Sequence, residues 1–138
     1  MGYTHYWRRE VGTGKPEQFD ELSLMVSNIR AMGEPTIDQA NTEDQIGFNG
    51  EDLPHETFVW TQTAKANFDF CKTAGKPYDE VVTACLLAVA SVYGDEVKVS
   101  SDGSSRDWGA GVRLFEEATR RKAPLDKIRT TDNAEMVS

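Results

Sequence analysis

The chain has 138 residues and a formal net charge of −8, and its length predicts a single domain that buries roughly two-thirds of its unfolded surface. The acidic balance argues against direct binding to a nucleic-acid backbone, because phosphates repel an acidic surface. Two partner classes stay open: basic protein surfaces, and small ligands held in a pocket whose charge differs from the average.

The first predicted element is a strand over residues 2–9, in which successive side chains alternate between two faces. Tyr3, His5 and Trp7 fall on one face of this strand, and Tyr6 falls on the other. Because aromatic side chains occupy both faces, we expect both to be covered to some extent by other parts of the chain.

An amphipathic helix is predicted next, over about residues 16–32. Pro16 suits the first helical position, where its fixed φ is favourable and its missing N–H costs nothing, and Gly33 ends the helix. Apolar residues recur at spacings of three and four, which is typical of a helix with one face against a core: Phe19, Leu22, Met25, Val26, Ile29 and Met32.

Short strands are predicted between this helix and the next, at residues 45–49, 57–61 and 68–72. The middle strand is rich in β-branched and aromatic residues, and in the last one Phe68 and Phe70 share a face. The polar segment that precedes these strands has no periodicity and is read as a loop.

A central helix is predicted over about residues 77–93, and the rest of the domain is expected to pack around it. Residues 81–93 are nearly all apolar, and a helix that is apolar on nearly every side is buried on nearly every side. Acidic residues bound this run at a length below the roughly 20 apolar residues of a membrane span. Gly94 ends the helix, and a strand follows at residues 97–101.

A last helix is predicted over about residues 106–122, weakened by Gly109 and Gly111 at about 1 kcal/mol each relative to alanine. Residues 1–123 are therefore assigned to one α+β domain. It is expected to have a single mixed or mainly antiparallel sheet of four to five strands, packed by the central helix and the two amphipathic helices. Residues 124–138 lack periodicity and are expected to form a mobile C-terminal tail.

The predicted compartment is the cytoplasm. The sequence opens without a charged-then-apolar signal segment, and two cysteines, Cys71 and Cys85, do not make a disulfide framework. We therefore expect reduced thiols and no membrane association.

Several phrases of the sequence are distinctive. The opening Gly-Tyr-Thr-His-Tyr-Trp at residues 2–7 is the clearest, and residues 55–58, 70–79 and the Ser-Ser-Asp-Gly loop at 100–103 add to it. In these phrases the chain resembles a group of small, largely uncharacterised proteins of bacteriophages and prophages. The resemblance implies a phage or prophage setting and transfers no catalytic residues. Many small acidic proteins from that setting antagonise host defence or redirect host factors.

His5 and His55 are the two histidines, and both are predicted on or beside strands. His55 and Thr57 form a His-x-Thr phrase, which two-histidine phosphoesterases use twice, with each histidine as acid or base and each hydroxyl holding phosphate. Trp7 stands where the phrase at His5 would need its hydroxyl, so the motif is half complete. A small phosphoesterase or nucleotide-handling enzyme that uses His5 and His55 is the alternative function.

Cys71 could act as a nucleophile only with a nearby base and a lowered pKa, and His5 or His55 could supply that base across the sheet. A small buried hydrophobic residue is the commoner role of such a cysteine. Two histidines without acidic or cysteine partners at metal spacing predict no metal site, and the sequence indicates no cofactor.

The leading interpretation is a small acidic protein of phage type that binds a host protein or sequesters a small ligand. Antagonism of host defence is the role that the resemblance associates with such a protein. A purely structural, self-associating component is a third possibility. Most aromatic side chains should be core, and any exposed ones would form a hot-spot patch for a protein or a stacking platform for a base. The candidate binding residues are Tyr3, His5, Trp7, His55, Lys72, Lys76, Asp102 and Trp108.

Overall fold

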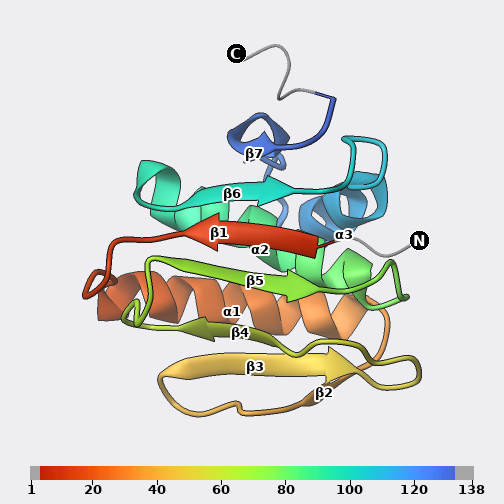
Figure 1. Ribbon diagram of the computed structural model, residues 1–138. Coiled ribbons are helices and arrows are strands. Elements are labelled where there is room, and N and C mark those ends of the chain that lie inside the picture. The colour runs from red at the N-terminus through yellow and green to blue at the C-terminus, as the bar shows by residue number, and fades with distance from the viewer. Residues whose placement is uncertain (1–3, 133–138) are drawn as a thin grey trace.

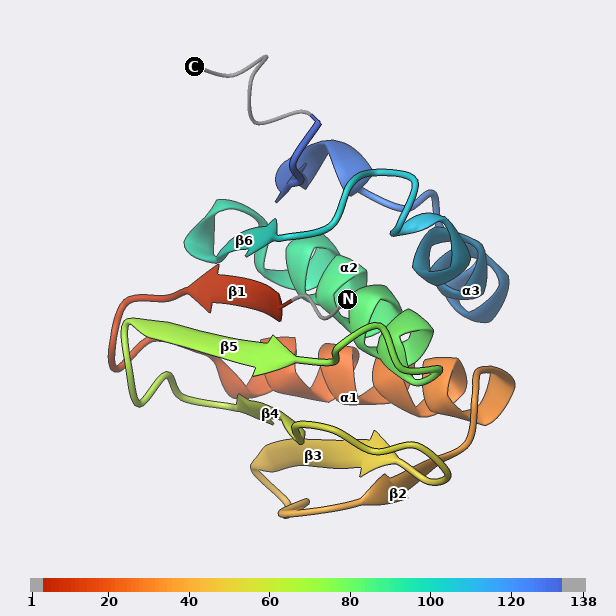
Figure 2. The same cartoon turned by 45° about the vertical axis from the view of Figure 1, so that its right-hand side comes forward.

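The structure, a computed structural model, describes residues 4–132 and has the α+β architecture that the sequence predicts (Figures 1 and 2). Strands form a layer at the front of Figure 1, and the helices lie behind this layer. The elements in chain order are β1 (Thr4–Arg8), α1 (Pro16–Met32), β2 (Thr36–Asp38), β3 (Gln45–Gly50), β4 (Phe58–Thr61), β5 (Phe68–Lys72), α2 (Asp79–Tyr93), β6 (Lys98–Ser101), α3 (Gly109–Thr119) and β7 (Ile128–Arg129).

Helix α2 forms the centre of the core, as predicted. No residue from Val81 to Ala90 is more than 3% exposed, because α1 and α3 pack against this helix and the strand layer covers its remaining side. Gly94 has a positive φ and begins a single 3₁₀ turn, Gly94–Glu96, that leads to β6. Within residues 4–132, no helix is long and apolar enough to cross a membrane.

The strands form two sheets instead of the single sheet that we predicted. One is four-stranded, in the order β5-β1-β6-β7, and the other is three-stranded, in the order β2-β3-β4. Arg9 ties the two together: its Nη1 donates to the Thr61 carbonyl at 2.8 Å, and its guanidinium lies 4.0 Å from the Trp60 ring centroid. The residue pattern of a strand predicts that the strand exists but not which strand it pairs with. The division into two sheets could therefore not be predicted from the sequence.

The C-terminal segment also departs from the prediction. Residues 124–138 were expected to be a mobile tail, but β7 pairs in parallel with β6, with Val99 opposite Ile128. Ile128 is buried, and the Thr131 N–H donates to the Gly103 carbonyl at 3.0 Å. A two-residue strand is too short to leave a periodic signal, which explains the error. The domain therefore continues at least to residue 132, and residues 133–138 lie outside the described residues.

Strand β1 is covered on one face only, although we expected cover on both. His5 and Trp7 point toward the helices and are buried, whereas Arg8 is exposed and Tyr6 is only half-buried. All helices of the described chain lie on the same side of the strand layer (Figure 1). No helix formed by residues 4–132 therefore covers the other side of the four-stranded sheet.

Helix α3 is shorter than predicted, and its two glycines have different roles. A Cβ on Gly111 would overlap Thr83 Oγ1 of α2, whereas a Cβ on Gly109 would meet only Arg113 Nη1, at 3.6 Å. We predict that Gly111→Ala lowers the free energy of unfolding by about 1–3 kcal/mol through overpacking. Gly109→Ala is the matched control and should raise it by up to about 1 kcal/mol, since alanine is the better helix former. Urea denaturation measures both, and equal effects of the two changes would contradict the close α2–α3 approach.

Candidate functional site

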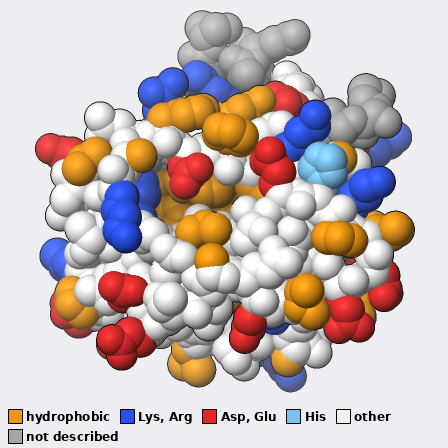
Figure 3. All heavy atoms as spheres, turned by 60° about the horizontal axis from the view of Figure 1, so that its bottom comes forward, with side chains coloured by type: hydrophobic (Ala, Val, Ile, Leu, Met, Phe, Trp, Pro, Cys, Tyr) orange, Lys and Arg blue, Asp and Glu red, His pale blue; other side chains and the backbone are white. Residues whose placement is uncertain are grey.

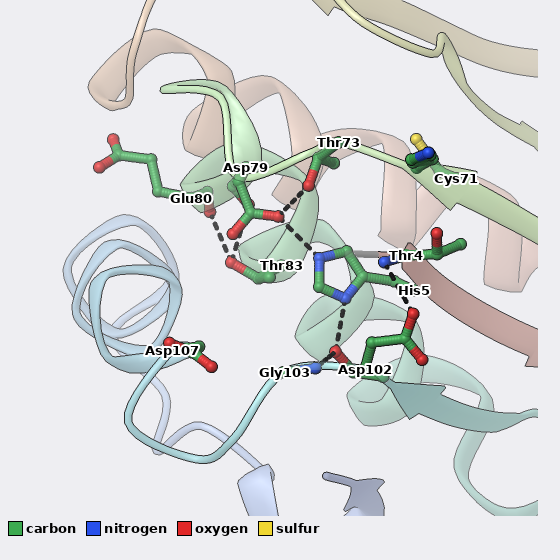
Figure 4. Close-up of polar contacts among 12 residues, drawn as sticks. Thr4, His5, Cys71, Thr73, Asp79, Glu80, Thr83, Asp102, Gly103 and Asp107 are labelled. Carbon is green, nitrogen blue, oxygen red and sulfur yellow. Dashed lines mark hydrogen bonds and ion pairs between the residues drawn. The ribbon is translucent and has the colours of Figure 1, made fainter. Parts of the chain in front are cut away.

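A buried polar junction joins three elements of the core (Figure 4). His5 of β1 contacts Asp79 at the start of α2, with 2.7 Å between Nε2 and Oδ1. On its other side His5 contacts Ser101 at the end of β6, with 2.8 Å between Nδ1 and Oγ. An ionised carboxylate only accepts, so the proton of a neutral imidazole lies on Nε2 and Nδ1 accepts from the serine hydroxyl. The catalytic triad of many hydrolases uses the same three residue types, but there the serine contacts Nε2 and the aspartate contacts Nδ1, whereas here the two partners lie on the opposite nitrogens.

The surroundings of this junction indicate a structural role instead of catalysis. Further donors occupy both ends: Thr73 Oγ1 donates to Asp79 Oδ1 at 2.5 Å, and the Gly103 N–H donates to Ser101 Oγ at 2.9 Å. A nucleophile must meet its substrate, but His5 is 0% exposed and Ser101 only 9%. The junction therefore fastens the start of α2 and the end of β6 to β1.

The two histidines of the phosphoesterase alternative are in different environments. His5 has no exposed surface, while His55 is exposed in the loop before β4, so the two rings cannot serve one phosphate in solvent. The backbone N–H of His55 donates to Asn49 Oδ1 at 3.1 Å, and Thr57 Oγ1 donates to Gln39 Oε1 at 2.6 Å. These contacts order the loop, and nothing in this geometry favours phosphoryl chemistry.

Cys71 is likewise not an activated nucleophile. Burial, with the negative charges of Glu56 and Asp79 as further causes, raises the pKa of its thiol to about 12. Burial also raises the pKa of Cys85, which lies inside α2. A thiol in such surroundings stays protonated and inert at neutral pH. Among residues 4–132, no three His, Cys, Asp or Glu side chains are grouped to hold a metal ion.

The candidate binding residues differ in exposure. His5, Trp7 and Trp108 are buried in the core, so the fold does not present these three side chains to a partner. Lys76 is half-buried in the turn before α2. Tyr3 lies outside the described residues. The candidates that are exposed are His55, Lys72 and Asp102.

The strongest candidate site is the side of the four-stranded sheet that faces away from the helices, here called the outer face. Residues opposite each other on neighbouring strands share a face. Tyr6 is opposite Phe70 on β5 and Ser100 on β6, and Arg8 is opposite Phe68 and Lys98. The outer face thus consists of Thr4, Tyr6, Arg8, Phe68, Phe70, Lys72, Lys98, Ser100 and Arg129.

An aromatic cluster lies on this face. Phe68 and Phe70 are 42% and 49% exposed. The Tyr6 and Phe68 rings stack with centroids 5.9 Å apart, and the Phe68 and Phe70 centroids are 6.2 Å apart. The Arg8 guanidinium lies 5.1 Å over the Phe68 ring. Figure 3, in which the bottom of Figure 1 is turned forward, shows hydrophobic side chains near its upper margin, with Lys or Arg side chains on one side and Asp or Glu side chains on the other.

The charges of the outer face differ in sign from the average of the chain. Its ionisable groups besides Tyr6 are cationic and exposed, namely Arg8, Lys72, Lys98 and Arg129. Asp102 lies at the rim, where its Oδ2 accepts from the Tyr6 hydroxyl at 3.0 Å. Partial burial and this carboxylate raise the pKa of Tyr6, so the phenol remains a donor. The sequence paired Phe68 with Phe70 on one face, but it held no signal for which face meets solvent.

A polar hollow of about 380 Å³ lies between α1 and the segment around β2 and β3. The cation in this hollow, Arg30, already has partners within the chain. Its Nη1 donates to Asp38 Oδ1 at 2.6 Å, and its Nε donates to Thr36 Oγ1 at 2.7 Å. Ligand pockets are usually more apolar and have convergent polar groups available, so this hollow is the weaker candidate.

Comparison of the chain with protein families, with curated proteins and with solved structures finds no match. The functional assignment therefore depends on the geometry of the described residues.

The polar junction predicts different effects for two neighbouring serines. Ser101→Ala removes a buried partner of His5 and of the Gly103 N–H, so it should lower the free energy of unfolding by about 1–3 kcal/mol. Ser100→Ala, on the outer face, should change it by less than about 0.5 kcal/mol, as for ordinary surface positions. Chemical denaturation of both variants measures the two free energies of unfolding. Equal values would contradict a structural role for the junction.

The thiols predict a loss of stability at alkaline pH. The Cys71 pKa is about 12 when folded but about 8.5 when unfolded, so above that lower value the unfolded state binds fewer protons and stability falls. The contribution of this thiol to the free energy of unfolding is complete below about pH 8.5 and is lost as the pH rises toward the pKa of the folded state.

A thiol reagent at neutral pH should label neither cysteine in the native protein and both in denaturant. Rapid native labelling of Cys71 would show that it is accessible.

Proposed function

We propose that this protein is a binding protein that captures a macromolecular partner through the outer face of its four-stranded sheet. The observation that carries the proposal is the exposed cluster of Tyr6, Phe68 and Phe70 with cations around it. Aromatic and arginine side chains dominate the binding energy of most interfaces. Contiguous exposed apolar groups are a cost to a monomer unless a partner covers them.

The scaffold beneath the outer face supports this role. The aromatic side chains stand on paired strands, and the polar junction fastens β1 to β6 and α2. Groups held on strands lose less conformational entropy on binding than groups on loops, because they are already ordered before the partner arrives. A rigid sheet with ordered aromatic groups is suited to binding a partner without catalysing a reaction on it.

The resemblance to bacteriophage and prophage proteins suggests the setting. A protein of that kind would act in the host cytoplasm, where its partner is a host factor, and its benefit to a phage would be to redirect that factor or to antagonise host defence. The acidic remainder of the surface would discourage nonspecific binding to nucleic acid elsewhere on the molecule.

A photo-crosslinking phenylalanine analogue placed at position 70 tests the proposal in bacterial cells. The analogue at Leu24, which is exposed on α1, is the matched control. We expect crosslinked partners from position 70 and not from position 24. Arg8→Ala in the crosslinking chain should lower the yield, since truncating a hot-spot residue costs more than about 1 kcal/mol of binding free energy. Equal yields from the two positions, or none from position 70, would refute the outer face as the binding surface.

A further inference from the structure

The arrangement of groups on the outer face indicates the chemistry of its partner. The register places them in rows that cross the strands: Phe70, Tyr6 and Ser100 form the middle row, and Phe68, Arg8 and Lys98 form the row beside it. Aromatic rings therefore occupy β5 and β1, and cations occupy the adjoining positions. Such a surface is complementary to a partner that carries flat apolar groups and negative charges at short intervals.

Unpaired nucleotides have this combination of groups. Sheets that bind single-stranded RNA stack two or three bases on aromatic side chains of neighbouring strands, and each stacked base contributes substantially to affinity because every base has a π-face. Phe70 is 49% exposed, whereas Phe68 stacks against Tyr6 and lies under the Arg8 guanidinium, so Phe70 is the more available of the two rings. Bases in a double helix are already stacked on one another, so only a single strand could use these rings.

The cations are placed to contact the phosphates that join such bases. Arg8 and Lys98 lie at one end of the aromatic cluster, Lys72 lies at the opposite end of β5, and Arg129 follows Ser100 across the sheet. The net charge of −8 argued against a nucleic-acid backbone, but phosphates respond to the local potential. The outer face itself carries four cations, with the carboxylates of Glu56, Asp95 and Asp102 beside them. Lys98 has only a 3.8 Å contact with the exposed Asp95, so it can leave that contact for a phosphate.

Asp102 offers an acceptor that could contact RNA but not DNA. Its carboxylate is exposed at the rim, where it accepts from the Tyr6 hydroxyl and from the Thr4 N–H through one oxygen. The other oxygen can accept from a ribose 2′-hydroxyl beside a base stacked on Tyr6. A carboxylate offers a deoxyribose nothing and repels phosphate, and the 2′-hydroxyl is the group by which proteins tell RNA from DNA.

From these contacts we infer that the partner of the outer face is single-stranded RNA, an inference that rests on the proposed function. Phe70 and the stacked Tyr6–Phe68 pair contact its bases, and Asp102 accepts from a ribose hydroxyl. The phosphates lie against Arg8, Lys72, Lys98 and Arg129.

Fluorescence anisotropy with a labelled RNA pool of about 12 nucleotides, a length that single-strand-binding surfaces cover, tests the inference on the full chain. Phe70→Ala should raise Kd by about 5- to 100-fold, the loss of one base stack. Leu24→Ala removes an exposed apolar side chain from α1 and should leave Kd unchanged. Thermal unfolding of both variants confirms that the fold is kept.

The salt dependence tests the phosphate contacts separately. Lys98→Gln and Arg129→Gln should each reduce the slope of log K against log salt by about 0.7, the value for one phosphate contact to a single strand. Lys122→Gln, at an exposed position beyond α3, is the matched control and should leave the slope unchanged. Asp102→Ala should narrow the difference in Kd between the RNA pool and DNA of the same sequences.

Three results would overturn the inference: no binding of the RNA pool at low salt, binding that Phe70→Ala leaves intact, or equal affinity for DNA. The crosslinker at position 70 then decides what remains. Crosslinks to a protein and not to RNA would refute the RNA partner and leave the outer face as the binding surface. Crosslinks to neither would refute both proposals.

Discussion

The complete burial of α2 is the constraint on which the rest of the structure depends. This helix has no polar side along Val81–Ala90, so water must be excluded from its whole circumference. The strand layer covers one side, and α1 and α3 cover the others. All three helices are thereby drawn to the same side of the sheets. In the part of the chain that the structure describes, no helix covers the opposite side of the four-stranded sheet, and the exposed aromatic cluster lies there.

The polar junction at the start of α2 sets how that apolar helix is oriented. An apolar surface can pack in several registers at similar free energy, whereas a buried carboxylate that lost its hydrogen bonds would cost several kcal/mol. Asp79 accepts from His5 and from Thr73 at this junction. Ser101 extends the junction to β6. The three side chains therefore hold α2 and β6 in fixed positions relative to β1.

Local charge and average charge lead to different functional conclusions for this protein. A net charge of −8 describes the far field, but a partner at contact distance meets the side chains of one face within a Debye length of roughly 8 Å. The outer face presents cations beside aromatic rings, with Phe70 half exposed on the edge strand β5. The acidic remainder of the surface would then repel polyanions everywhere except at this face, which favours a single mode of binding.

Local sequence patterns predicted the three helices and most of the strands, but not the short strands β2 and β7. Pro16 and Gly33 marked the limits of α1, and the nearly continuous apolar run after Glu80 predicted the burial of α2. These signals are local, since capping and periodicity act within one or two turns. The tertiary structure alone decided which elements meet: the pairing of β7 with β6, the separation of two sheets, and the burial of His5, Trp7 and Trp108. Alternation along a strand defines two faces but not which of them the helices cover, because that depends on contacts between residues far apart in the chain. Only the fold could therefore show that Tyr6, Phe68 and Phe70 lie together in solvent.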